Sequence, residues 1–206
     1  MKLDEILSLA PVIPVIVLDD AAQAKPLAAA LAAGGLRVLE VTLRTNAALE
    51  SISRMREVDG VIVGAGTVLD AEQLRAAIDA GAQFAVSPGL TPPLARAAQA
   101  ASIELLPGVV TASEVMVARE SGFRQLKFFP AESSGGVAQL KSFASVFRDV
   151  VFCPTGGITP LNAKNYLALP NVACVGGSWL TPPELLRAGN RPAMTELARA
   201  AATLRN

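Results

Sequence analysis

Histidine is absent from this chain of 206 residues, and cysteine and aromatic residues are scarce. Without an imidazole, the chain cannot build the Ser-His or Cys-His pairs that activate many hydrolytic nucleophiles. The two cysteines and the scattered carboxylates lack the spacing of metal ligands, which argues against zinc hydrolysis. No Walker or dinucleotide-binding fingerprint occurs either. Any reaction must therefore use lysine, arginine, carboxylates and backbone amides.

Net charge and long hydrophobic runs are also missing. Lys+Arg and Asp+Glu balance at 18 each, so no overall field attracts nucleic acid or an anionic membrane. No apolar run reaches the roughly 18 residues that a membrane span requires. We therefore expect small-molecule ligands, with neither nucleic acid nor a membrane as a partner.

The amino-terminal segment imitates a secretory signal peptide, with an early lysine followed by an apolar stretch. Asp4 and Glu5 offset its positive start, and two prolines interrupt the apolar stretch. Cys153 and Cys174 lie in apolar, strand-like runs, which is typical of reduced packing residues. These features favour a cytoplasmic protein.

Short β-branched and apolar runs alternate with alanine-rich segments of helical character, such as residues 20–35 and 70–82. This alternation predicts parallel strands joined by right-handed crossovers. We interpret the chain as an α/β protein, a single (β/α)₈ TIM-barrel domain over residues 1–206 with a short N-terminal helix. The eight expected strands are residues 12–18, 38–43, 61–66, 84–89, 103–108, 126–131, 151–156 and 172–177.

An open, doubly wound sheet is the alternative fold. It would normally carry a glycine-rich loop after its first strand, where this chain has "LDD". The glycine-rich loops instead follow the seventh and eighth expected strands. That position favours the barrel, in which chemistry collects at the carboxyl ends of the strands.

Lys127, one of five lysines, stands in the apolar run "QLKFFPA". Strand alternation directs Leu126 and Phe128 towards the helices and Lys127 into the barrel, near the strand end set by Pro130. One interpretation is a lysine with a buried stem whose head reaches the rim. The other is a nucleophile, kept neutral by desolvation and by a neighbouring cation such as Arg44, that forms a Schiff base with a carbonyl.

Polar residues also end the second and third expected strands. In "VLEVTLRT", alternation places Glu40 and Arg44 on the face that points into the barrel. They either form an internal ion pair, or supply a proton-shuttling carboxylate beside a guanidinium that binds an anion. Thr67 in "GAGT" is compatible with a ligand close to the backbone and equally with a helix cap.

Glycine pairs occur in "PTGGIT" and "VGGSW", residues 154–159 and 175–179. A glycine pair followed by a helix start exposes a row of backbone N–H groups and adds the positive end of the helix dipole. Many barrels bind phosphate with these two loops, although glycine also serves turns alone. The "SPG" segment around Pro88 is compatible with turn chemistry.

Together these motifs resemble a known family, the bacterial 2-keto-3-deoxy-6-phosphogluconate (KDPG) aldolases, which also act to varying degrees on 4-hydroxy-2-oxoglutarate (KHG). The resemblance covers about residues 11–187 in family order. It rests on "PVIPVIV", "GGLRVLEVTLRT", "VGAGTVLD", "GAQFAVSPGLT", "LPGVVTASE", "KFFPAE", "FCPTGGI" and "VGGSWL".

The resemblance implies a role for each of these positions. Lys127 corresponds to the Schiff-base residue and Glu40 to the general acid/base. Arg44 and Thr67 would hold the carboxylate of the pyruvate part, in a pocket lined by Pro88. The phosphate-binding residues that it implies are Thr155, Gly156, Gly157, Gly176, Gly177 and Ser178.

The implied reaction is class I cleavage of KDPG into pyruvate and D-glyceraldehyde 3-phosphate, with no metal and no organic cofactor, in a homotrimer. One departure from the family is visible, because Asp19 and Asp20 stand where some members have basic residues near the phosphate. KHG therefore stays open as the main substrate. The galactonate-series phosphate is a further alternative, because the sequence does not specify the stereochemistry at C4. Another phosphate-binding barrel enzyme, such as an isomerase, and a catalytically silent sugar-phosphate sensor are the remaining alternatives.

Overall fold

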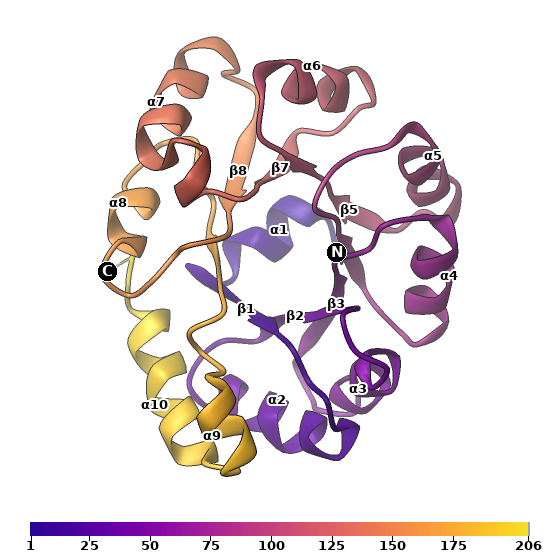
Figure 1. Cartoon of the computed structure of the whole chain (residues 1–206), viewed down its shortest axis with the longest axis vertical. Helices are drawn as coiled ribbons and strands as arrows, with labels where there is room; N and C mark the ends of the chain where they lie inside the picture. Colours follow the sequence, from indigo (N-terminus) through magenta and orange to yellow (C-terminus); the bar gives the residue numbers. More distant parts are fainter. Residues whose placement is uncertain (206) are drawn as a thin grey trace.

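The apolar runs of the sequence form a ring of parallel strands inside a layer of helices (Figure 1). The computed structural model describes residues 1–205. Strand β1 pairs with β2 on one side and with β9 on the other, so the sheet curls back on itself. The strands are β1 Val12–Ile16, β2 Val38–Thr42, β3 Ile62–Gly66, β4 Phe84–Val86, β5 Glu104–Leu106, β6 Gly108–Val109, β7 Gln125–Phe128, β8 Val151–Pro154 and β9 Val175–Gly177.

Two short interruptions divide this ring. The fifth expected strand is split into β5 and β6 at Pro107, which has no N–H to donate, but the Pro107 carbonyl still accepts from Lys127 N at 2.9 Å. Strands β8 and β9 are joined through the Phe152–Val172 and Thr155–Gly176 bridges. Each of the eight expected runs therefore contains a strand of a closed barrel, which confirms the (β/α)₈ prediction and rules out the open sheet.

The helices follow the strands in the expected alternation. Asp70 caps α4 by accepting from Gln73 N at 2.8 Å, and Thr111 and Glu114 form a capping box at the start of α6. The helices are α1 Leu3–Ser8, α2 Ala24–Ala33, α3 Ala48–Met55, α4 Ala71–Asp79, α5 Pro92–Ala101, α6 Ala112–Glu120, α7 Gly136–Val146, α8 Ala163–Leu167, α9 Pro183–Arg187 and α10 Arg191–Ala202, with 3-10 turns η1 Ala21–Gln23 and η2 Glu132–Ser134.

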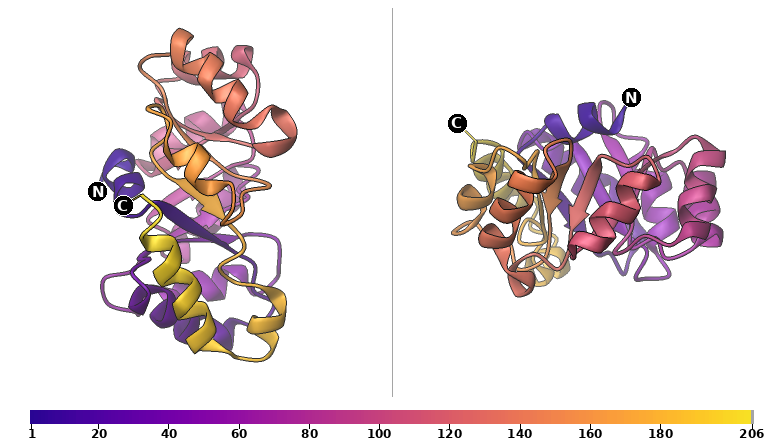
Figure 2. Two further views of the ribbon diagram at one scale, coloured as in Figure 1. Left: turned by 90° about the vertical axis from the view of Figure 1, so that its left-hand side faces the viewer. Right: turned by 90° about the horizontal axis from the view of Figure 1, so that it is seen from above.

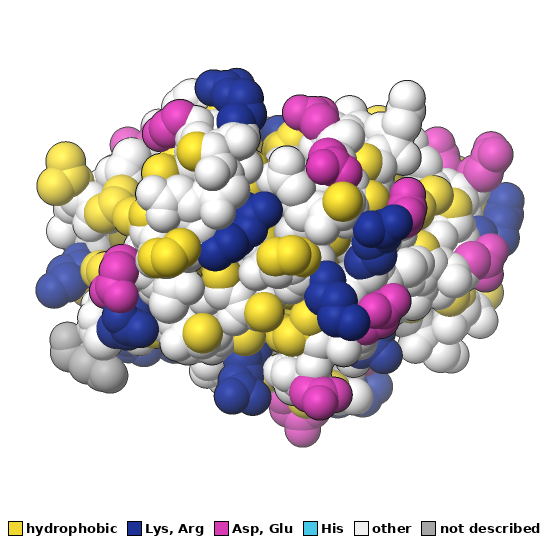
Figure 3. Space-filling model, turned by 90° about the horizontal axis from the view of Figure 1, so that it is seen from below, with side chains coloured by type: hydrophobic (Ala, Val, Ile, Leu, Met, Phe, Trp, Pro, Cys, Tyr) yellow, Lys and Arg dark blue, Asp and Glu magenta, His cyan; other side chains and the backbone are white. Residues whose placement is uncertain are grey.

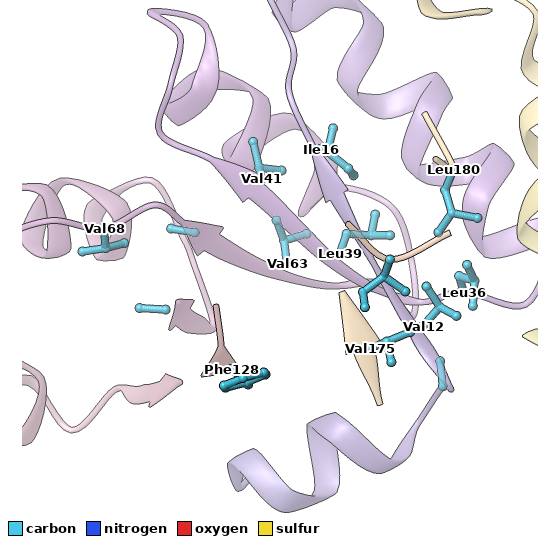
Figure 4. Close-up of a cluster of buried hydrophobic side chains, with 14 of the residues drawn as sticks. Val12, Ile16, Leu36, Leu39, Val41, Val63, Val68, Phe128, Val175 and Leu180 are labelled. Atoms are coloured by element: carbon cyan, nitrogen blue, oxygen red, sulfur yellow. The ribbon is translucent and has the colours of Figure 1, made fainter. Parts of the chain in front are cut away.

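Strand alternation sorts the apolar side chains into two cores. The outer core lies between strands and helices and contains Leu39, Val41, Leu126 and Phe128, as drawn in Figure 4 for three of them. Full burial of each such side chain contributes about 1.5–3 kcal/mol. The layer therefore supplies most of the apolar burial that holds helices to strands.

The inner core fills one end of the barrel and is closed by α1. Leu3, Ile6 and Leu7 of α1 pack against inward-facing strand residues that include Cys153 and Cys174. Both cysteines are buried and free, as expected for packing residues. The views in Figure 2 show α1 at this end of the molecule. Polar side chains that enter the barrel are thereby confined to its other end.

Within residues 1–205, no helix combines the length and the hydrophobicity needed to cross a membrane.

Candidate active site

Lys127 and Glu40 meet inside the barrel, from strands on different sides of the ring. Lys127 lies on β7 and Glu40 on β2, and they are 4% and 3% exposed. Lys127 Nζ donates to Glu40 Oε1 at 3.4 Å and stands 5.1 Å from the centre of the Phe129 ring. The side-chain directions expected from alternation are confirmed, because Leu126 and Phe128 belong to the outer core.

The charged neighbour of Lys127 differs from the one expected. Its partner is the Glu40 carboxylate, whereas the hydrogen bond of Arg44 runs from Nε to Thr67 Oγ1 at 3.3 Å. The carboxylate stabilises the ammonium by its charge and is also placed to take its proton. These contacts therefore support a proton-exchanging pair rather than a lysine kept neutral by a cation.

Glu40 is held in place by the backbone of β3. A Cβ atom added at Gly66 would stand 2.2 Å from Glu40 Oε1 and 2.6 Å from its Cγ. Only a glycine lets the glutamate side chain lie this close to the neighbouring strand. Gly66 thus fixes which way the carboxylate points.

Arg44 and Thr67 lie just beyond the ends of β2 and β3. The strand ends at Thr42, so Arg44 stands in an exposed turn rather than on the strand itself. Thr67 has φ of 59°, a left-handed conformation that is strained for a β-branched residue. Such strain persists where the surroundings fix the backbone, and it is common at ligand sites. The pair offers a guanidinium and a hydroxyl at the mouth of the barrel.

Pro88 lies near Lys127 because its backbone contacts Gly108 of β6. A Cβ atom on Gly108 would lie 2.2 Å from the Pro88 carbonyl carbon, so the two backbones are in direct contact. Gly108 is paired with Lys127 in the β6–β7 register. The Pro88 backbone is therefore one strand away from the lysine.

The two glycine loops also meet. Thr155 bridges to Gly176, and its hydroxyl would stand 2.3 Å from a Cβ atom there. Within residues 1–205, the backbone N–H groups of Gly157 and Ser178, which lie outside the strands, have no backbone acceptor, whereas Gly156 adjoins the Thr155–Gly176 bridge. Free amides at adjoining turns suit an anion.

The helix start expected directly after each glycine pair is wrong. Helix α8 begins at Ala163 and α9 at Pro183, several residues beyond Gly157 and Gly177. The intervening residues form turns instead, in which Asn162 Nδ2 donates to Gly157 O at 3.0 Å and Asn162 Oδ1 accepts from Thr159 N. An anion at these loops would therefore be bound by backbone amides alone, without the positive end of a helix dipole.

A cavity of about 370 Å³ adjoins the second glycine loop. Its lining includes Ser178, Asp19, Asp20, Gln23 and Arg187. The two acidic residues singled out in the sequence are thus close to a predicted phosphate residue. Arg187, which the sequence did not reveal because it belongs to the distant α9, adds a cation to the same wall.

Sequence reasoning also missed Glu132 and Tyr166. Tyr166 Oη donates a short hydrogen bond to Glu132 Oε1, directly behind the first glycine loop. Burial of Tyr166, and then the neighbouring Glu132 carboxylate, raise the pKa of this tyrosine above its ordinary value. The glutamate stands in the motif "KFFPAE", but nothing in that motif indicates a tyrosine partner more than thirty residues away.

A lysine paired with a carboxylate inside a (β/α)₈ barrel, beside loops with free amides, defines the class of barrels equipped for lysine chemistry at their strand ends. The chain belongs to the KDPG and KHG aldolase family, whose model matches residues 3–197.

Curated relatives cover most of the chain. It is 58% identical over 180 residues to the 2-dehydro-3-deoxy-phosphogluconate aldolase of Zymomonas mobilis, which covers 87% of this chain and 86% of the relative. It is 53% identical over 199 residues to the KHG/KDPG aldolase of Escherichia coli, covering 96% of this chain and 93% of that protein.

A solved structure extends the likeness to the fold. The KDPG aldolase of Legionella pneumophila, crystallised with pyruvate captured at low pH as a covalent carbinolamine intermediate, superposes with a TM-score of 0.96. It is 45% identical, and the match covers 98% of this chain and 99% of that one.

Replacing Gly66 with alanine tests the placement of Glu40. We expect Gly66→Ala to lower the free energy of unfolding by about 1–3 kcal/mol, because the added methyl overlaps the glutamate side chain. In a Glu40→Ala background the same substitution should cost clearly less, since the overlap is gone. Urea unfolding of the four proteins measures this difference. An equal loss in both backgrounds would show that Gly66 does not confine Glu40.

Proposed function

We propose that this protein is a class I aldolase that cleaves KDPG to pyruvate and D-glyceraldehyde 3-phosphate. The observation that carries the proposal is the buried pair of Lys127 and Glu40, 3.4 Å apart at the open end of the barrel. Membership of the family and the relatives at 58% and 53% identity support the substrate. The covalent carbinolamine in the Legionella pneumophila structure supports a covalent route through an amine.

Lys127 is the proposed nucleophile. After it gives a proton to Glu40 or to water, Nζ adds to the C2 carbonyl of the substrate and forms a carbinolamine. Glu40 returns a proton to the C2 hydroxyl, which leaves as water and yields the iminium. At 3.4 Å from Nζ, the Glu40 carboxylate is within reach of both transfers.

The iminium then accepts the electrons of the C3–C4 bond. Arg44 and Thr67, at the barrel mouth, would hold the adjacent carboxylate so that this bond aligns with the iminium π-system. Glu40, through a water molecule, takes the proton of the C4 hydroxyl. The bond breaks, the aldehyde departs and an enamine stays on Lys127. Protonation at C3 and hydrolysis then return pyruvate and the free amine.

The free amides of the glycine loops are the proposed phosphate site. Gly157 and Ser178 have N–H groups without a backbone acceptor within the described chain, and Thr155 and Gly176 join the two loops through a bridge. Gly156 and Gly177, the neighbours of these residues, complete the proposed set. We propose that Pro88 lines the carboxylate pocket, because its backbone contacts Gly108, which pairs with Lys127 in the sheet.

The wider setting completes the proposal. We propose a single barrel domain that works as a cytoplasmic homotrimer and takes small anions as its partners. Figure 3 shows the side of α2, α3 and α9, where the described basic and acidic side chains are interspersed. Mixed charge on that side suits a protein whose ligand is a small molecule rather than a nucleic acid.

KHG is a second candidate for the main substrate. The carboxylates of Asp19 and Asp20 share a cavity with Ser178, so they repel a phosphate dianion held there. A shorter substrate without a phosphate does not meet this repulsion. Arg187 on the same cavity opposes it, and the balance sets the preference.

Removal of the proposed nucleophile tests the function. We expect Lys127→Ala to lower kcat for KDPG cleavage at least about a thousandfold, because the covalent route is lost. Lys141→Ala, which alters an exposed lysine of α7, is the matched control and should leave kcat unchanged. Coupling pyruvate release to lactate dehydrogenase measures both. Full activity of Lys127→Ala would contradict the mechanism, and no turnover by the unmodified protein would favour a sensor or an isomerase.

The charges near Ser178 give a second prediction. Asp19→Asn removes a carboxylate with no capping role, whereas Asp20 accepts from Ala22 N and caps η1. We expect Asp19→Asn to raise kcat/KM for KDPG by about twofold to fivefold at low salt, and Arg187→Gln to lower it similarly, since charges at this range act through solvent. Values for KHG should change less. Changes of equal size and sign on both substrates would contradict this.

A further inference from the structure

The segment that follows the Lys127 strand lies along the first glycine loop. Ala131 N donates to Thr155 O at 2.8 Å, and Glu132 N donates to Gly156 O at 3.1 Å. The Glu132 side chain then passes directly beside Gly157: a Cβ atom there would stand 2.6 Å from Glu132 Cβ and 2.7 Å from its Cγ. The Glu132 carboxylate is therefore carried next to the Gly157 amide, which is free to bind an anion.

Tyr166 controls where that carboxylate points. The tyrosine is fully buried in α8, and its hydroxyl donates to Glu132 Oε1 on the side of Gly136. Asn162, at the start of the same helix, binds the Gly157 carbonyl at 3.0 Å. The turn that carries the amides is thus fixed from α8 at two points, by Asn162 through the backbone and by Tyr166 through Glu132.

We propose that Tyr166 is a positioning residue for the phosphate end of the substrate, acting by holding the Glu132 carboxylate away from the N–H group of Gly157. The inference rests on the proposed function, since it assigns the loop to the substrate phosphate. It adds a residue that touches neither the substrate nor Lys127.

The physical reason is competition between two anions. A carboxylate readily accepts hydrogen bonds from backbone amides, and one tethered beside them has a high local concentration. Released from Tyr166, the Glu132 side chain is exposed and free to rotate towards Gly157. It would then occupy donors that the phosphate needs and add a repulsive charge. The tyrosine hydroxyl gives the carboxylate an alternative donor.

Tyr166→Phe removes only that hydroxyl and keeps the buried ring. We expect it to raise KM for KDPG by about fivefold to tenfold, the scale of one ordinary hydrogen bond, with kcat unchanged. KM for KHG, which has no phosphate, should stay the same. Ser51→Ala is the matched control. It deletes another fully buried hydroxyl, which donates to Ala47 O within α3, far from the first glycine loop.

Combining the change with Glu132→Gln separates positioning from packing. Glutamine keeps an acceptor for Tyr166 but carries no charge. Glu132→Gln alone should therefore either leave KM for KDPG unchanged or decrease it. In the Tyr166→Phe/Glu132→Gln protein the freed side chain is neutral, and KM should return towards the original value. A double variant as impaired as Tyr166→Phe, or an equal effect on KHG, would overturn the proposal.

Calorimetric binding of glycerol 3-phosphate gives a readout that does not need turnover. The dissociation constant should rise with Tyr166→Phe and recover in the double variant, even if the substrate of the enzyme differs from KDPG. If glycerol 3-phosphate does not bind to the unmodified protein, the loop is not a phosphate site and the inference fails, while cleavage of KHG through Lys127 would still stand.

Discussion

The buried contact between Lys127 and Glu40 is the constraint on which the rest of the site depends. Two charged groups that are almost without solvent exposure are stable only when they face each other, and removal of one partner of such a pair costs about 3–5 kcal/mol. Helix α1 closes one end of the barrel against solvent, and Gly66 of β3, which has no side chain, leaves room for Glu40 beside the strand. A pair held in this way is also ready to exchange a proton, which links the stability of the interior to its chemistry.

Strand β7 also connects Lys127 to the first glycine loop. Beyond Lys127 the chain continues through Ala131 and Glu132, whose amides bind the carbonyls of Thr155 and Gly156. The Lys127 strand and the first glycine loop are therefore parts of one hydrogen-bonded unit. On the proposed assignment, a fixed distance between them would let a phosphate bound at the loop orient the substrate carbonyl over the Lys127 amine.

Much of this could be predicted because it follows from local periodicity. The alternation of apolar residues predicted the eight strands, and the same alternation predicted that the Lys127 side chain enters the barrel. Contacts between distant elements could not be predicted. Tyr166 meets Glu132 only because α8 folds behind the glycine loop, and Arg187 reaches the cavity of Asp19 only through α9. The late starts of α8 and α9 depend on turn bonds such as those of Asn162, which no glycine motif encodes.

Borohydride reduction of the protein in the presence of pyruvate tests the central claim most directly. If Lys127 forms an iminium, reduction converts it into a stable secondary amine, and peptide mapping will find one carboxyethyl group, derived from pyruvate, on the peptide that contains "KFFPAE". Inactivation should parallel the adduct, and Lys127→Ala should acquire none. An adduct on another lysine, or no adduct under conditions in which the enzyme turns over, would contradict the account.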